Sequence, residues 1–160
     1  MTDLLTPGFA TKLEGFGINK GDVVVDYGCG PGRYLEKASE LVGKDGLVYA
    51  ADVNKIAIEE VQGLIARQGL TNVEPVLING YDSGLESDCA DVIYALDMFH
   101  AVEKPERFLA ELERILKRTG GLILEDGHQP REDSKKKVNS SRLWNIEAET
   151  EDYLVCLPKK

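Results

Sequence analysis

A short apolar run that leads directly into three alternating glycines restricts the fold of this chain more than any other feature. The run is Val23–Val25, the glycines are Gly28, Gly30 and Gly32, and apolar residues then recur at helical spacing through Arg33–Val42. Glycine has no Cβ, so it permits a tight turn and lets the backbone approach a ligand closely. The sequence therefore predicts a strand, a ligand-binding loop and a helix in direct succession.

Further apolar runs alternate with amphipathic segments along the rest of the chain. The predicted strands are Val23–Val25, Leu47–Ala51, Val73–Ile78, Val92–Leu96 and Leu122–Leu124, and the later helices contain Ala57 to Ile65 and Phe108 to Leu116, the second ending at Gly120 and Gly121. This alternation is typical of a parallel sheet with helices on both faces. The last two runs, Trp144–Glu149 and Tyr153–Leu157, predict an antiparallel hairpin. We expect a Rossmann-like, doubly wound α/β sheet of about seven strands.

The length and the charge of the chain narrow its organisation and its partners. A chain of 160 residues has the size of one domain, so we expect a single domain over residues 1–160, with residues 1–20 as an N-terminal lid or helix segment. The formal net charge is −9, which disfavours nucleic acid as a partner. Lys135, Lys136 and Lys137 form the only basic run, and we interpret it as a solvated face.

The spacing of the cysteines and the lengths of the apolar runs indicate the cellular compartment and whether a metal site is expected. Cys29, Cys89 and Cys156 are far apart and show no Cys-x-x-Cys spacing, so we expect neither disulfides nor a metal site. No apolar stretch reaches the roughly 18 residues that a membrane span needs, and no secretory leader is recognisable. A cytoplasmic protein without membrane contact is the resulting expectation.

The residues around the glycines separate three nucleotide-binding patterns. A dinucleotide fold would place its third glycine where Arg33 stands, and no Gly-Lys-Ser or Gly-Lys-Thr sequence of a P-loop opens the helix. Asp52 ends the second strand, where a carboxylate can accept both hydroxyls of a ribose. Asp52 could instead cap the following helix, a role that Asn54 could equally fill.

Three segments carry a resemblance to a known family. Val24 to Gly32 resembles motif I of the class I S-adenosylmethionine-dependent methyltransferases, with an acidic residue followed by G-x-G-x-G. Asp91–His100 with Pro105–Leu109 resembles the fourth strand and next helix of the ubiquinone and menaquinone biosynthesis type, and Leu112–Leu124 resembles their passage into strand five. The resemblance covers residues 12 to 126.

The resemblance implies a cofactor, S-adenosylmethionine, with S-adenosylhomocysteine as the product. It also implies binding residues: Asp26, Tyr27, Gly28, Gly30 and Gly32 at the methionine part, Asp52 at the ribose, Val53, Asn79 and Gly80 at adenine, and Ala95 and Asp97 completing the methionine pocket. Tyr81 is also counted among the cofactor-binding residues. Five aromatic residues could line an acceptor pocket, with Tyr81 the strongest candidate: Tyr27, Tyr34, Tyr81, Phe99 and Trp144. Asn79 stands where many relatives have Asp, and its side-chain carbonyl can still accept from the adenine amino group.

The reaction expected from the resemblance is direct displacement of a methyl group, for which alignment supplies much of the rate. The family lends no fixed catalytic residue. His100 and His128 are the only histidines, and both follow predicted strand ends, where an imidazole could take a proton or simply be solvated.

The sequence selects neither the methyl acceptor nor the subunit arrangement. The acceptor is a small molecule or a protein. Leu4, Leu5, Phe9, Leu13 and Phe16 could form at most one N-terminal lid helix, and the segment Gln129–Ser141 is polar. This predicts an open acceptor cleft, completed by a mobile lid, a second subunit of a homodimer or a large substrate. The alternative is a rigid small pocket closed by the N-terminal helix. A non-catalytic adenosylmethionine-binding protein and an NAD-dependent oxidoreductase are the alternatives.

Overall fold

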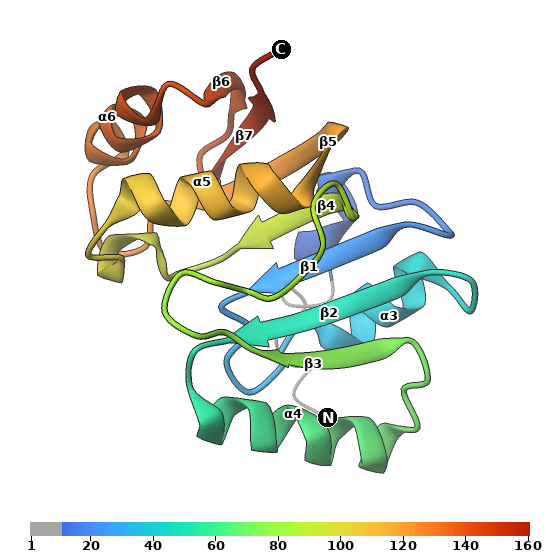
Figure 1. Cartoon of the computed structure of the whole chain (residues 1–160). Helices are drawn as coiled ribbons and strands as arrows, with labels where there is room; N and C mark the ends of the chain where they lie inside the picture. The colour runs from blue at the N-terminus through green and yellow to red at the C-terminus, as the bar shows by residue number, and fades with distance from the viewer. Residues whose placement is uncertain (1–10) are drawn as a thin grey trace.

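The computed structural model describes residues 11–160 and contains one seven-stranded sheet (Figure 1). The strand order is β3-β2-β1-β4-β5-β7-β6. The strands are β1 Val23–Tyr27, β2 Leu47–Asp52, β3 Val73–Leu77, β4 Ala90–Ala95, β5 Leu116–Glu125, β6 Trp144–Glu149 and β7 Tyr153–Pro158. Strands β1 to β5 pair in parallel, and β7 joins β5 and β6 in antiparallel register. The predicted doubly wound sheet with its C-terminal hairpin is confirmed.

Helices cover both faces of the sheet. The α-helices are α3 Leu35–Val42, α4 Lys55–Gln68, α5 Pro105–Ile115 and α6 Arg131–Ser141, and two 3-10 helices are η1 Lys12–Phe16 and η2 Phe99–Ala101. Successive strand residues point to opposite faces, so Val24 packs in a core with α3 and α4 whereas Val25 packs in a core with α5. None of the helices described within residues 11–160 combines the length and apolarity that a bilayer span requires.

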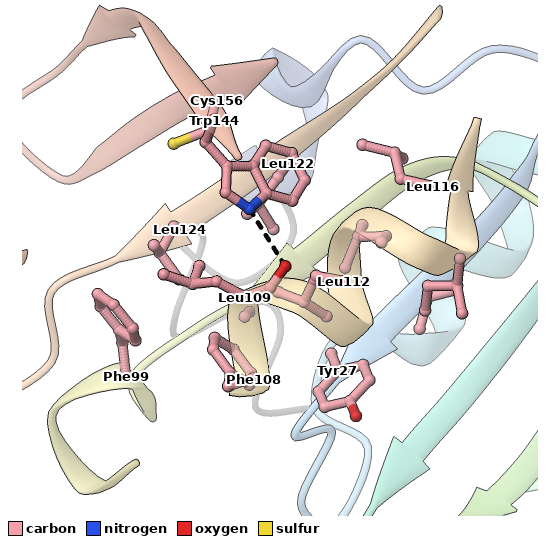
Figure 2. Close-up of a cluster of buried hydrophobic side chains, with 14 of the residues drawn as sticks. Tyr27, Phe99, Phe108, Leu109, Leu112, Leu116, Leu122, Leu124, Trp144 and Cys156 are labelled. Carbon is pink, nitrogen blue, oxygen red and sulfur yellow. Dashed lines mark hydrogen bonds between the residues drawn. The ribbon is translucent and has the colours of Figure 1, made fainter. Parts of the chain in front are cut away.

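The core beneath α5 is closed by the C-terminal hairpin. Trp144 is 1% exposed and lies among Leu109, Leu122 and Cys156, and its indole Nε1 donates a hydrogen bond of 3.2 Å to the Leu109 carbonyl oxygen (Figure 2). Aromatic and aliphatic side chains of α5, β5 and β6 therefore form one continuous apolar layer.

The predicted end of the helix at Gly120 and Gly121 is wrong. Helix α5 ends at Ile115, and Leu116 already has an extended backbone with φ −84° and ψ 135°. Leu116 pairs with Ala90 and Gly121 pairs with Val92, so the register shift between them absorbs the extra residues as an irregularity in β5. A Cβ at Gly120 would lie 2.7 Å from the Asp91 carbonyl oxygen, which explains a glycine inside this segment.

The segments expected to cover the site lie elsewhere or outside the described residues. Leu13 and Phe16 of η1 are buried, and the Phe16 ring contacts Tyr94 and Tyr153. The polar segment after β5 forms α6, which packs against α5 and β6. The apolar residues Leu4, Leu5 and Phe9, which the sequence suggested for a lid helix, lie outside the described residues.

Candidate functional site

The loop after β1 is fastened to the end of β2. Gly28 N and Cys29 N both donate to the Ala51 carbonyl oxygen, at 2.7 and 2.9 Å, and Gly30 N donates to Asp52 Oδ2 at 2.9 Å. Because β1 and β2 are neighbours, these bonds hold the glycine loop and Asp52 together at the carboxyl edge of the sheet. The strand order reverses direction here, between β1 and β4, where ligands of open α/β sheets bind.

Glycine stands at the three positions of the loop for different physical reasons. All have positive φ, at 82°, 56° and 94° for Gly28, Gly30 and Gly32. A Cβ at Gly32 would lie 2.8 Å from Leu35 Cδ1, so Gly32 allows the loop to pack on its own helix. A Cβ at Gly30 would meet nothing within 4 Å. The backbone at Gly30 is therefore the open part of the loop, and ligand contact by Gly32 stays a prediction.

Asp52 does not cap the following helix. Asn54 is the N-cap of α4, and its side chain accepts from Ile56 N at 2.8 Å and from Ala57 N at 3.4 Å. The Asp52 carboxylate accepts from Gly30 N through Oδ2 and from Asn54 N through Oδ1. Each carboxylate oxygen can accept more than one hydrogen bond, so both oxygens remain able to accept from a ligand hydroxyl.

A cleft of about 670 Å³ opens beside Asp52. This volume falls within the range of small-molecule and cofactor sites, about 300–1,000 Å³. The lining residues are Tyr27, Gly28, Asp52, Val53, Ile78, Asn79, Gly80, Tyr81, Met98, Ala101, Val102, Glu103 and Phe108. Val53 is 62% exposed although it is apolar, which fits a side chain that packs on a ligand.

The structure brings seven of the predicted binding residues to this cleft and leaves five out of its lining. The seven are Tyr27, Gly28, Asp52, Val53, Asn79, Gly80 and Tyr81, and the five are Asp26, Gly30, Gly32, Ala95 and Asp97. Sequence reasoning missed the wall formed by Ile78, Met98, Ala101–Glu103 and Phe108. The signal for part of this wall was available, because the segment between β4 and α5 starts at the carboxyl edge of the sheet.

Asp26 lies beneath the loop rather than in the cleft. The residue is 2% exposed, and the Tyr94 hydroxyl donates to Asp26 Oδ2 at 3.0 Å. Burial raises the pKa of Asp26 to about 7; the Tyr94 hydrogen bond acts to lower this pKa, and the nearby charge of Asp52 acts to raise it. Because carboxyl groups with shifted pKa values cluster at functional sites, the loop above Asp26 is a candidate site.

Of the five aromatic residues suggested for an acceptor pocket, two line the cleft and three, Tyr34, Phe99 and Trp144, do not. Tyr27 and Tyr81 line the cleft; the Tyr27 ring packs edge-on against Phe108 at a centroid distance of 5.7 Å, and the Tyr81 hydroxyl accepts from Lys104 N at 3.0 Å. Phe99 and Trp144 are fully buried in the core beneath α5, and neither lines the cleft.

His100 and His128 lie 28 positions apart in the sequence but contact each other in the structure. Their ring centroids are 4.7 Å apart with an interplanar angle of 88°. His128 Nε2 lies 3.8 Å from Asp97 Oδ1, and His100 Nδ1 is buried with no hydrogen-bond partner among the residues that the structure describes. Within residues 11–160, no group of three or more histidine, cysteine or acidic side chains has an arrangement that could hold a metal ion.

Comparison with known proteins gives a consistent set of relatives. A family model described as a methyltransferase domain matches residues 18–155. The chain is 29% identical over 144 residues to the ubiquinone/menaquinone biosynthesis C-methyltransferase UbiE of Marinomonas sp., covering 86% of this chain and 57% of that protein. It is 28% identical over 116 residues to ribosomal RNA large subunit methyltransferase E of Methanococcus aeolicus, covering 67% of this chain and 43% of that protein.

The fold also matches solved structures. A S-adenosylmethionine-dependent methyltransferase from Aquifex aeolicus superposes with a TM-score of 0.81 and 26% identity, over 93% of this chain and 87% of that chain. The chain thus spans about half the length of the two curated relatives and most of the length of this structural neighbour.

Proposed function

This chain belongs to the class I S-adenosylmethionine-dependent methyltransferase family, and we propose that it binds S-adenosylmethionine in the cleft beside Asp52 and transfers the methyl group to an acceptor. The observation that carries this proposal is the Asp52 carboxylate, joined through Gly30 N to an open glycine loop at the mouth of the cleft. An acceptor for two ribose hydroxyls and a close-approach backbone are the parts that an adenosyl ligand requires.

The residues present fit the cofactor. Both oxygens of Asp52 can accept from the ribose, the exposed Val53 side chain offers an apolar surface to adenine, and the Asn79 amide oxygen can accept from the adenine amino group. The bound cofactor supplies an electrophilic methyl group on a sulfonium. We place the sulfonium end near Gly28 and Gly30, with Asp97 beyond it; Ala95 is fully buried behind this point.

The two alternative functions have less support. An NAD-dependent oxidoreductase would need the third glycine that Arg33 replaces. A purely binding protein has no support among the relatives compared, which are named as methyltransferases. We therefore propose catalysis rather than binding alone.

The acceptor is proposed only by class. The named relatives include enzymes of quinone biosynthesis and of ribosomal RNA modification, so kinship does not select one acceptor. The net charge of −9 argues against nucleic acid, which favours a small molecule or a protein. We propose an open acceptor cleft that is completed by a lid, a large substrate or the second subunit of a homodimer. We also propose that the protein works in a reducing compartment such as the cytoplasm, because Cys29, Cys89 and Cys156 are free cysteines.

The direct test is ligand-induced stabilisation. S-adenosylhomocysteine or S-adenosylmethionine at about 100 times its Kd should stabilise the protein by about 2.7 kcal/mol, which corresponds to a rise in Tm of about 5–10 °C for a domain of this size. NAD at the same concentration should leave Tm unchanged. Differential scanning fluorimetry measures the shift, and calorimetry that finds no binding of either adenosyl compound at millimolar concentration would overturn the proposal.

The role of Asp52 can be separated from helix capping by two neighbouring substitutions. Asp52→Ala should weaken S-adenosylhomocysteine binding about 10- to 150-fold, because charge-assisted hydrogen bonds contribute about 1.5–3 kcal/mol. Asn54→Ala should instead lower the free energy of unfolding by about 0.5–2 kcal/mol, through loss of the α4 cap, and leave the affinity nearly intact. Titration calorimetry on both folded variants gives the answer. Equal affinities for wild type and Asp52→Ala would remove Asp52 from the binding site.

A further inference from the structure

Asp97, His100 and His128 form a polar cluster where the chain leaves β4 and β5. Asp97 follows β4, His100 lies in η2, and His128 lies between β5 and α6. Because β4 and β5 are parallel neighbours, their carboxyl ends lie at the same edge of the sheet as the glycine loop. In Figure 1 the orange chain between β5 and α6 passes beside the yellow segment after β4.

Glycine at position 127 makes this contact between the histidines sterically allowed. Gly127 has φ 70°, and a Cβ built on it would lie 2.0 Å from His100 Nδ1. The backbone before His128 therefore rests directly on the His100 ring, and the His100 ring in turn meets His128 edge to face. A side chain at position 127 would therefore clash with the His100 ring and displace it from its present position.

Asp97 occupies an unfavourable backbone conformation. Its φ is 53°, in the left-handed region that only glycine enters freely and that Asp and Asn tolerate. Residues held in such conformations cluster at active sites. The conformation places Asp97 Oδ1 at 3.8 Å from His128 Nε2. This distance is longer than a hydrogen bond, as is often seen for catalytic pairs before substrate is bound.

The cluster borders the proposed methyltransfer site. Met98, next to Asp97, packs against the glycine loop so closely that a Cβ at Gly28 would lie 3.0 Å from Met98 Cγ. Met98 and Ala101, on either side of His100 in the chain, line the cleft. His128 itself is exposed, with 80% of its side chain accessible. His128 and Asp97 are thus both accessible to solvent next to the segment that lines the cleft.

We propose that His128 is the general base for the acceptor, oriented by Asp97 and seated on His100, and that the acceptor is a neutral molecule whose nucleophile is a hydroxyl oxygen. This inference rests on the proposed methyltransferase function. With Nε2 facing Asp97, His128 Nδ1 is the nitrogen left to take a proton. The part of the cleft lining that is not assigned to the cofactor includes Met98, Val102 and Phe108 with Glu103, and its mainly apolar character suits an uncharged acceptor.

The proposed step balances without another reactant. The acceptor O–H bond breaks, its proton goes to His128 Nδ1, and its electron pair stays on oxygen. The oxygen forms a bond to the donor methyl carbon as the carbon–sulfur bond breaks, and that electron pair remains on sulfur. The products are a methyl ether, a neutral thioether and a protonated His128 whose charge faces Asp97.

Two other charged groups near the cluster, Asp126 and Lys137, have partners of their own. Asp126, two residues before His128, accepts from Arg131 Nε through both carboxylate oxygens at 3.0 Å. Lys137 of α6 donates to Gln129 Oε1 at 2.6 Å and lies 5.4 Å from the Phe99 ring centroid. Asp97 is thus the carboxylate paired with His128 at this edge.

A binding experiment tests the cluster without turnover. The chain has two histidines, so NMR resolves one set of imidazole signals for each. When catechol, as a hydroxyl probe, is added to the S-adenosylhomocysteine complex, the His128 signals should shift saturably and more than the His100 signals. Gly127→Ala should abolish the nuclear Overhauser contacts between the two rings and reduce this shift. A His128 signal that catechol does not move in a saturated complex would overturn the inference and leave the proposed function intact.

A kinetic experiment separates a base from a structural residue. His128→Gln should lower kcat for catechol methylation about 10²- to 10⁴-fold, the usual contribution of a general base, and should remove the acidic limb of the pH–rate profile. The affinity for S-adenosylhomocysteine should not change. Asp97→Asn should lower kcat less than His128→Gln does, because Asn tolerates the same backbone conformation as Asp. The control Asp133→Asn, at an exposed position, should not change kcat.

The outcomes remain distinguishable. If the wild-type protein does not bind S-adenosylhomocysteine, the proposed function fails and this inference fails with it. If it binds, and His128→Gln retains the wild-type kcat and pH profile, the inference alone is wrong. If wild type does not methylate catechol, the NMR shift of His128 decides whether a hydroxyl group binds beside it.

Discussion

Replacing Asp26 with Asn is expected to stabilise the ligand-free protein increasingly as the pH rises. The pKa of Asp26 is raised from 3.8 to about 7, first because burial removes the carboxylate from water. The native state therefore holds a proton that the unfolded chain has released. Stability from this group is fully present below pH 3.8, the unfolded-state value, and is lost as the pH rises through the folded pKa of about 7.

The size of this effect follows from the pKa difference. Each unit corresponds to about 1.36 kcal/mol, so the free energy of unfolding of wild type should fall, through this group, by about 3 kcal/mol between about pH 4.5 and about pH 8. Asp26→Asn lacks this fall. Any cost of burying the amide of Asn is the same at both pH values and cancels in the difference.

Urea unfolding at the two pH values measures the effect, with Asp45→Asn as a control that removes an exposed carboxylate. The variant should gain on wild type by about 3 kcal/mol over this range, whereas the control should follow wild type. Parallel pH profiles for wild type and Asp26→Asn would show that the buried carboxyl group titrates normally.

Asp26, beneath the glycine loop, lowers the stability of the folded protein. A chain selected only for stability would carry an apolar or amide side chain under the loop, because a buried carboxylate without a cationic partner is unfavourable. The Asp26 carboxyl group accepts a hydrogen bond from Tyr94 and has the negative charge of Asp52 near it. Local rules are commonly broken in this way at functional sites, and a cationic ligand above the loop would offset the cost.

The order of strands and helices could be predicted because it depends on local patterns. The run Val23–Val25 with the glycines after it, and the apolar spacing in the following helices, report periodicity directly. The passage from α5 to β5 could not be placed correctly, since the extended conformation at Leu116 depends on pairing with Ala90, which is distant in the chain. Tertiary pairing overrides helix propensity at such a boundary.

The site could be predicted where topology alone brings residues together. Asp52 and Gly28 follow neighbouring parallel strands, so their proximity follows from strand order. Phe108 carries no chemical signal that distinguishes a cleft wall from a core residue, and it was missed. The contact between His100 and His128 depends on the close approach of Gly127, which only the folded structure reveals.

Replacing Trp144 with Ala is expected to have the largest effect on stability of any change considered for this protein. The side chain is 1% exposed and joins the C-terminal hairpin to α5 (Figure 2). Loss of a buried aromatic side chain removes its transfer free energy and leaves a cavity, which together cost about 3–5 kcal/mol. Such a loss is a large fraction of the roughly 5–15 kcal/mol that stabilises an ordinary domain.

Trp144→Phe separates packing from the hydrogen bond to the Leu109 carbonyl. Phe keeps an aromatic ring in the layer but cannot donate, so this variant should lose about 1 kcal/mol for the hydrogen bond, plus a cost for its smaller ring. Because Trp144 does not line the cleft, both variants should bind S-adenosylhomocysteine normally when folded. Urea unfolding followed by circular dichroism measures the losses, since Trp144 is the chain's one tryptophan and its removal abolishes that fluorescence. A loss below about 1 kcal/mol for Trp144→Ala, within the range of a surface substitution, would mean that the hairpin contributes little to the core beneath α5.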